Sequence, residues 1–103
     1  MNQERIRIAM ADDHPVVRRG LRAFIASQPE FDVVVECGDG DALIESLRQT
    51  EVDLVLLDLL MPGGGAGLVQ RLGDLAPDAR IVALTSSEDA RLLLDVLQAG
   101  VLA

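Results

Sequence analysis

Three short polar stretches each follow an apolar run, and their side chains have the chemistry needed to handle a phosphoryl group. Asp12 and Asp13 come after the first run, Asp58 ends the third, and Thr85 follows the last. An uninterrupted apolar run is typical of a parallel strand buried on both faces. Ligands of such sheets bind just outside the carboxyl ends of the strands. We therefore expect these four side chains to meet at one edge of a sheet.

Three carboxylates in a small space repel one another, so a cation is expected among them. Mg²⁺ fits because it prefers carboxylate oxygens and substrate phosphate and keeps several of its waters. A hydroxyl at the next strand end can donate to a phosphoryl oxygen. The pattern indicates phosphoryl transfer to a carboxylate, with Asp58 as the candidate reactive group.

Each of these residues also has a structural interpretation. Asp12 and Asp13 can serve as turn or N-cap residues, Asp58 can cap a turn, and Thr85 can cap a helix. His14 is expected to start a helix and to be neither a metal ligand nor a catalyst. Their joint placement on successive strand ends favours the functional interpretation.

The elements that must position these residues alternate along the chain. Val17, Leu21, Phe24 and Ile25 recur at the spacing of an amphipathic helix that begins near Pro15. The other apolar stripes predict three further helices, the last starting at Ser87 and ending before Gly100. The expected strands cover 6–11, 31–36, 53–58 and 81–84, and the helices follow them around 15–27, 41–47, 68–75 and 87–99.

Alternation of strands and helices with short connections predicts an α/β fold, a doubly wound parallel sheet with right-handed crossovers. The glycine-rich stretch 63–65 cannot continue a strand or start a helix cleanly, so we expect a flexible loop over Asp58.

Composition limits the remaining possibilities. The chain has 103 residues, enough for one domain, and a formal net charge of -8, which argues against direct nucleic-acid contact. The single cysteine, Cys37, cannot form an internal disulfide, which fits a reducing compartment such as the cytoplasm. We see no signal peptide and no apolar stretch long enough to span a membrane.

The residues that carry this pattern resemble a known family. The stretches 11–21 (ADDHPVVRRGL), 53–63 (DLVLLDLLMPG) and 81–85 (IVALT) are similar to the receiver domain of bacterial two-component response regulators. The first stretch looks like the NarL/FixJ subfamily, whose members usually carry a LuxR-type helix-turn-helix. The resemblance covers essentially all of residues 1–103 and implies a flavodoxin-like receiver fold.

The resemblance implies a role for each matching residue. Asp58 would be the phosphoacceptor for a phosphohistidine of a sensor histidine kinase. Asp13 and Asp58 would bind Mg²⁺ directly, Leu60 would add its backbone carbonyl, and Asp12 would act through water. Thr85 would be the switch hydroxyl. Slow self-dephosphorylation is the only enzymatic activity implied.

Two departures from the family pattern matter. The loop after Pro62 reads as glycines where the family usually has Asp or Asn before Gly, and it is about one residue short. The chain also ends at Ala103, where the family's fifth strand, which carries a phosphoryl-binding lysine, should begin, and it contains no lysine. We therefore expect strand order 2-1-3-4, without the fifth strand and helix, in a C-terminally truncated or degenerate receiver.

Such a chain would expose apolar surface. The strand at 81–84 would lie at the sheet edge, and the helix after it is apolar nearly all round. We expect self-association, most simply a homodimer, with Leu92 and Val96 on the dimer or partner surface.

Four hypotheses follow. The leading one is a phosphoacceptor switch domain of a transcriptional regulator, and the alternative is a receiver-like interaction module that is not phosphorylated. A flavin or nucleotide binder is disfavoured because Asp12 and Asp13 stand where its phosphate loop should be. A phosphatase with an aspartate nucleophile usually places that residue after the first strand, not at Asp58.

Overall fold

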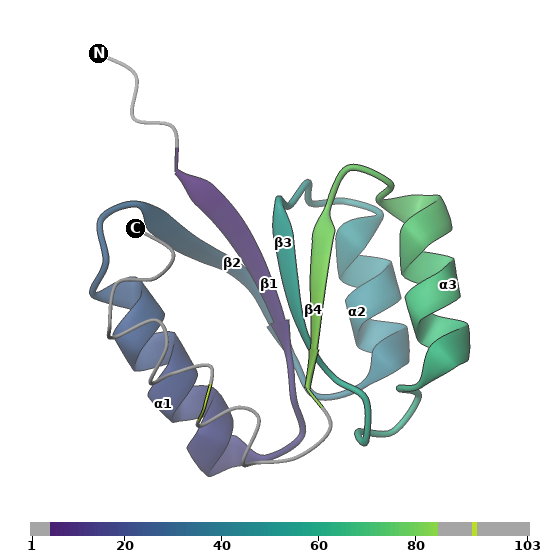
Figure 1. Cartoon of the computed structure of the whole chain (residues 1–103), viewed down its shortest axis with the longest axis horizontal. Helices are drawn as coiled ribbons and strands as arrows, with labels where there is room; N and C mark the ends of the chain where they lie inside the picture. Colours follow the sequence, from purple (N-terminus) through teal and green to yellow (C-terminus); the bar gives the residue numbers. More distant parts are fainter. Residues whose placement is uncertain (1–4, 85–91, 93–103) are drawn as a thin grey trace.

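The computed structural model describes residues 5–84 and residue 92, and its central feature is a sheet of four parallel strands (Figure 1). The strands lie in the order β2-β1-β3-β4, as predicted. Each is short and mostly apolar, as expected of strands covered on both faces. Their bounds are Ile6–Ala11 (β1), Phe31–Cys37 (β2), Leu54–Asp58 (β3) and Arg80–Leu84 (β4).

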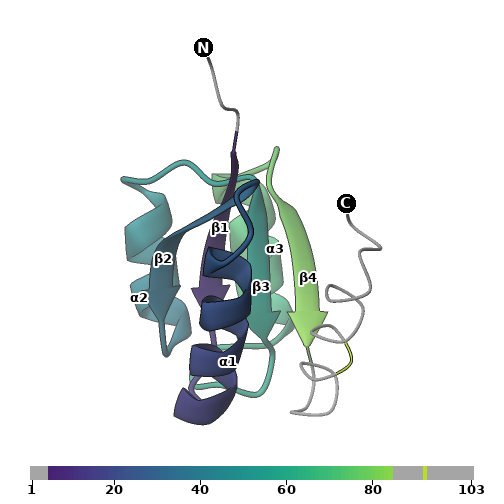
Figure 2. The same ribbon diagram turned by 90° about the vertical axis from the view of Figure 1, so that its left-hand side faces the viewer.

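Helices connect the strands and cover both faces of the sheet. Helix α1 (Pro15–Ala26) lies on one face, and α2 (Gly40–Leu47) and α3 (Ala66–Leu75) lie on the other (Figures 1 and 2). Pro15 occupies the first turn of α1, where its missing N–H costs nothing. Asp39 caps α2 by accepting a hydrogen bond of 2.8 Å from the backbone N–H of Ala42.

Successive side chains of the inner strands point to opposite faces of the sheet, so the core consists of two clusters, one on each face. In β1, Ile8 and Met10 face α1, whereas Ala9 and Ala11 face α2 and α3. All four side chains are buried. Small residues on the two-helix face let those helices approach the sheet, and this packing fixes the strands whose ends carry the acidic residues.

The predicted elements are confirmed within the described residues, with small shifts at their ends. Strand β2 extends one residue further, to Cys37, and β4 starts one residue earlier, at Arg80. The described residues contain no fifth strand. The predicted helix at 87–99 lies outside the described residues except for Leu92. In the described part of the chain no helix has the length and apolar character needed to cross a bilayer.

The predicted glycine loop is present; one hydrogen bond ties it to α2 and another lies within the loop. The backbone N–H of Gly40 donates to the carbonyl of Pro62 over 2.9 Å, and Gly64 N–H donates to the Met61 carbonyl over 2.9 Å. Gly63 has a φ of 77°, which favours glycine. The loop that follows the acidic strand end is therefore anchored on the start of α2.

Candidate functional site

The ends of β1 and β3 bring the predicted acidic residues together. The two strands are neighbours in the sheet, with Ala11 opposite Leu57, so Asp12 and Asp13 emerge beside Asp58. A backbone hydrogen bond of 3.0 Å from Asp12 N–H to the Cys37 carbonyl extends the pairing past the end of β1. The parallel arrangement thus places all three acids at one rim of the sheet.

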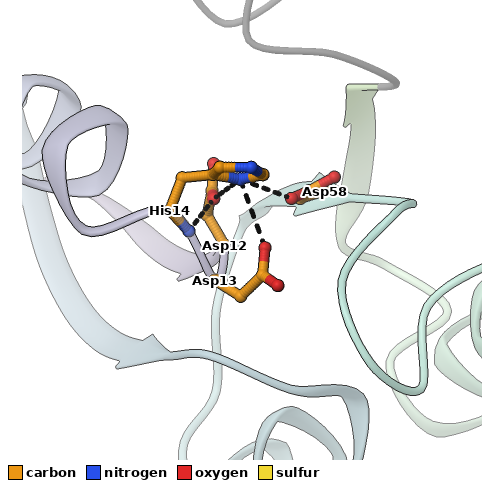
Figure 3. Close-up of side chains that lie close together, drawn as sticks. All are labelled: Asp12, Asp13, His14 and Asp58. Atoms are coloured by element: carbon orange, nitrogen blue, oxygen red, sulfur yellow. Dashed lines mark hydrogen bonds and ion pairs between the residues drawn. The ribbon is translucent and has the colours of Figure 1, made fainter.

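Four side chains form a compact cluster at this rim (Figure 3). One ligand atom from each of Asp12, Asp13, His14 and Asp58 lies within 4.8 Å of the other three. Asp12 and Asp58 are buried, whereas Asp13 and His14 are exposed. We call these four residues the acidic-rim cluster. It is open on the side of Asp13 and His14 and closed on the side of the two buried acids.

The two oxygens of Asp58 have different surroundings. Oδ1 accepts a hydrogen bond of 2.9 Å from the backbone N–H of Leu60. Oδ2 is buried and accepts no hydrogen bond from any residue that the structure describes. Burial raises the pKa of this carboxyl, and Asp12 and Asp13 raise it further, although the Leu60 N–H opposes the change. A buried carboxylate with one unsatisfied oxygen calls for a bound partner.

His14 lies over the acids because the chain turns sharply after β1. Its backbone N–H donates to Asp12 Oδ1 over 2.7 Å, and its ring Nδ1 lies 3.2 Å from the same oxygen. Nδ1 is also 3.2 Å from Asp13 Oδ1 and 3.4 Å from Asp58 Oδ2 (Figure 3). The hydrogen bond to Asp12 raises the pKa of the imidazole.

The prediction for His14 is confirmed for the backbone and incomplete for the ring. The residue is the N-cap of α1, but its side chain makes no capping hydrogen bond. Sequence reasoning missed that the ring joins the acids. The available signal was the two-residue separation from Asp12, which suits a side chain-to-backbone turn.

A second layer holds Asp12 in place. Arg18, one turn into α1, donates from a terminal guanidinium nitrogen to the backbone carbonyl of Asp12 over 2.8 Å. The Nε of Arg18 lies 3.2 Å from a carboxylate oxygen of Glu36 on β2, whose other oxygen pairs with Arg22 at 2.6 Å. The start of α1 and the ends of β1 and β2 are thus locked together beneath the acids.

The acidic-rim cluster fits a divalent cation such as Mg²⁺. Three carboxylates supply hard oxygen ligands, and the unsatisfied Oδ2 of Asp58 is a free coordination point. Asp12, Asp13 and Asp58 are brought together as predicted, and the backbone of Leu60 follows two residues later. Thr85 comes directly after β4 but lies outside the described residues.

The predicted dimer surface is described only in part. Leu92 is 62% exposed, so its side chain is available for a contact. Val96 lies outside the described residues.

The chain is similar to proteins of one family. Residues 8–103 match the family model described as the response regulator receiver domain. The uncharacterized transcriptional regulatory protein YhcZ of Bacillus subtilis is 41% identical over 96 residues, which cover 92% of this chain and 45% of that protein. The oxygen regulatory protein NreC of Staphylococcus epidermidis is 34% identical over 97 residues, 92% of this chain and 44% of that protein. The chain therefore spans less than half the length of these relatives.

Solved structures give the same result for the fold. The response regulator RcsB in its complex with DNA aligns with a TM-score of 0.76 and 31% identity, over 91% of this chain and 50% of that one. The non-phosphorylated receiver domain of RcsB from Escherichia coli aligns with a TM-score of 0.74 and 31% identity, over 88% of this chain and 76% of that one.

Proposed function

This chain belongs to the response regulator receiver family, and from that premise we propose that Asp58 accepts a phosphoryl group from the phosphohistidine of a sensor kinase. A carboxylate oxygen of Asp58 attacks phosphorus, a P–O bond forms, and the P–N bond to the kinase histidine breaks. The electron pair of that bond returns to the imidazole nitrogen. The product is an aspartyl phosphate, a phosphorylated switch state of a two-component regulatory system.

One observation carries the proposal, namely the unequal surroundings of the two Asp58 oxygens. The Leu60 N–H holds Oδ1 at 2.9 Å and so fixes the orientation of the carboxyl. Oδ2 accepts no hydrogen bond from any described residue, which leaves its lone pairs available. An acid that served only to cap a turn would not need a buried and unsatisfied second oxygen.

Mg²⁺ is the cofactor that suits the three carboxylates of the cluster. Asp13, Asp58 and the backbone carbonyl of Leu60 would hold it directly, and Asp12 would hold it through a water. When bound, the ion supplies positive charge that offsets the carboxylates and the phosphoryl oxygens. Thr85, which follows β4 directly, would donate its hydroxyl to the phosphoryl group and so report phosphorylation to the rest of the domain.

The partners follow from this role. A histidine kinase supplies the phosphoryl group, and self-association through Leu92 and Val96 carries the signal on. The curated relatives are transcriptional regulators by name, so we propose a transcriptional output through a separate DNA-binding segment. Residues 1–103 would form the receiver domain of a cytoplasmic regulator and would not touch DNA directly. Any enzymatic activity would be limited to slow self-dephosphorylation.

A second candidate is a receiver-like interaction module that is not phosphorylated. The observation that favours it is the side chain of Leu92, which is apolar, 62% exposed and so available for a contact with another chain. In this reading the acidic-rim cluster would only bind a cation, and dimerisation would be the function.

Intact mass after incubation with acetyl phosphate separates the two candidates. We expect a gain of one phosphoryl group that requires Mg²⁺, is absent with a chelator and is lost in Asp58→Asn. Asp53→Asn is the matched control, because Asp53 precedes the opposite end of β3 and binds the backbone of Arg7 at 2.8 Å. An unmodified mass for a folded wild-type chain would refute the acceptor role and leave the interaction module.

A further inference from the structure

The imidazole of His14 has a position that phosphoryl acceptance does not require. Its Nδ1 lies almost equally far from three carboxylates, at 3.2 Å from Asp12 Oδ1, 3.2 Å from Asp13 Oδ1 and 3.4 Å from Asp58 Oδ2. One N–H can donate well to only one of these oxygens. Nδ1 therefore forms a good hydrogen bond with at most one of these oxygens, although all three lie within ion-pair distance of it.

All three distances also agree with the spacing of ligand atoms around a bound metal. In a tetrahedral site with bonds of about 2.0 Å, neighbouring ligand atoms are about 3.3 Å apart. The separations of 3.2, 3.2 and 3.4 Å match three of the six edges of such a site, and the four ligand atoms all lie within 4.8 Å of one another. Zn²⁺ is commonly held in this geometry by imidazole nitrogen and carboxylate oxygen together.

On this geometry, and on the assumption that the proposed metal site is correct, we infer that His14 is a fourth protein ligand that makes the acidic-rim cluster prefer a divalent transition ion to Mg²⁺. Nitrogen ligands favour Co²⁺ and Zn²⁺, whereas Mg²⁺ prefers oxygen and sheds water reluctantly. The residue would thus determine which metal the receiver takes.

Two further observations point to a ligand here. Asp58 Oδ2 is buried, lacks a hydrogen bond from any described residue, and is the oxygen that faces Nδ1. The residue is also bound to Asp12 Oδ1 twice, by its backbone N–H at 2.7 Å and by its ring Nδ1 at 3.2 Å. The side chain is 58% exposed, so an ion from solvent can reach it.

Metal titrations of the whole chain test this inference. Co²⁺ and Mg²⁺ are titrated separately by calorimetry into the wild type and into His14→Phe, which keeps a planar ring and removes the nitrogen. All proteins carry Cys37→Ser, so that the thiol cannot bind cobalt. We expect His14→Phe to weaken Co²⁺ binding at least about tenfold and to change Mg²⁺ binding less than about twofold. Equal effects on both metals, or none on Co²⁺, would overturn the inference.

Proton NMR of the Co²⁺ form gives a direct readout. His14 is the only histidine, so any imidazole signal belongs to it. Ligation through Nδ1 predicts one exchangeable, hyperfine-shifted Nε2–H signal that is absent in His14→Phe. A cobalt-bound chain without that signal would show that the ring is only a hydrogen-bond donor.

The two proposals fail in different ways. If Mg²⁺-dependent phosphorylation of Asp58 is present but the metals are not discriminated by His14, only this inference falls. If the wild type binds neither ion, both the inference and the metal site of the proposed function fall.

Discussion

Asp58 is the residue at which burial and the proposed acceptor role oppose each other most directly. Burial raises the pKa of its carboxyl above the ordinary value of 3.8, and Asp12 and Asp13 add to the rise. A carboxyl whose pKa is higher in the folded state than in the unfolded state destabilises the folded state once both forms are ionised. At neutral pH and without metal, ionised Asp58 therefore lowers the free energy of unfolding.

Asp58→Asn should consequently stabilise the protein. The neutral amide keeps an acceptor for the Leu60 N–H and can donate to the neighbouring carboxylates. With chelator at pH 7 we expect a gain of about 1 kcal/mol. This corresponds to a melting temperature higher by roughly 4–8 °C in a chain of this size, measured by circular dichroism.

The pH dependence provides the control for that prediction. The advantage of Asp58→Asn should shrink as the pH falls through the raised pKa of the wild-type carboxyl toward 3.8, because protonation removes the charge there as well. An advantage that stayed constant down to that pH would mean that the stabilisation does not come from the charge of Asp58.

Cys37 should be unreactive in the folded protein. Its half-buried thiol lies at the end of β2, and burial raises its pKa to about 11. Because only the thiolate reacts, alkylation by iodoacetamide at pH 8 should be about 100-fold slower in the native protein than in denaturant. Comparable rates in the two states would show that the thiol is accessible and ionised.

The backbones of α2 and the glycine loop are closely packed where Gly40 meets Gly63. A Cβ built on Gly40 would lie 2.4 Å from the carbonyl oxygen of Gly63, and both groups are backbone. Gly73 in α3 has nothing within 4 Å of such an atom. The two glycines therefore form a matched pair for the same substitution.

We expect Gly40→Ala to destabilise and Gly73→Ala to stabilise. The first forces the loop off α2 and should cost about 1–3 kcal/mol. The second removes glycine from a helix interior and should add about 0.5–1 kcal/mol. Urea denaturation measures both, and a stable Gly40→Ala protein would show that the loop can move away from α2 at little cost.

Arg18 connects α1 to the acidic rim. It binds the backbone carbonyl of Asp12 at 2.8 Å and also pairs with Glu36, whereas Arg22 pairs with Glu36 alone among the described residues. Arg18→Ala should loosen Asp12 and weaken Mg²⁺ binding about tenfold, as outer-layer changes at metal sites do. Arg22→Ala should leave Mg²⁺ affinity nearly unchanged. If calorimetry showed that both variants lose Mg²⁺ affinity equally, the effect would come from Glu36 or from net charge and not from Asp12.

The elements are predictable from the sequence because local and global signals agree. The apolar run at 54–57 is typical of a buried inner strand, the run at 81–84 forms the strand beside it, and Pro15 marks the start of α1. The contact of Pro62 and Gly63 with Gly40 could not be predicted from the sequence. It joins residues more than 20 positions apart and is made by backbone atoms. A glycine pattern shows freedom of the backbone but not what the backbone will touch.

The acidic residues of the site are predictable for the same reason, since parallel strands end at one rim. The position of the His14 ring is not. It depends on a turn in which Asp12 binds the backbone of His14, and a histidine before a helix has several rotamers available in other settings. The support that Arg18 gives to Asp12 was likewise hidden, because an arginine on an exposed helix face usually only faces solvent.

For the molecule as a whole, charge limits association. The chain carries 17 acidic and nine basic residues, a formal net charge of -8. Two copies repel unless salt screens them or a metal offsets the acidic rim. Apolar contact must therefore drive any dimer, and Leu92, at 62% exposed, is a side chain suited to such a contact.

Self-association should accordingly strengthen with salt. Raising ionic strength from about 0.01 M to about 1 M shortens the reach of the charges from roughly 30 Å to roughly 3 Å. Sedimentation at high protein concentration should then shift from monomer toward dimer. Leu92→Glu should weaken the dimer at least about tenfold, because a charge would enter the apolar contact. Val16→Glu is the matched control, since Val16 is 82% exposed on α1. A clean monomer at high salt would refute self-association, and sensitivity to Val16→Glu alone would move the interface to α1.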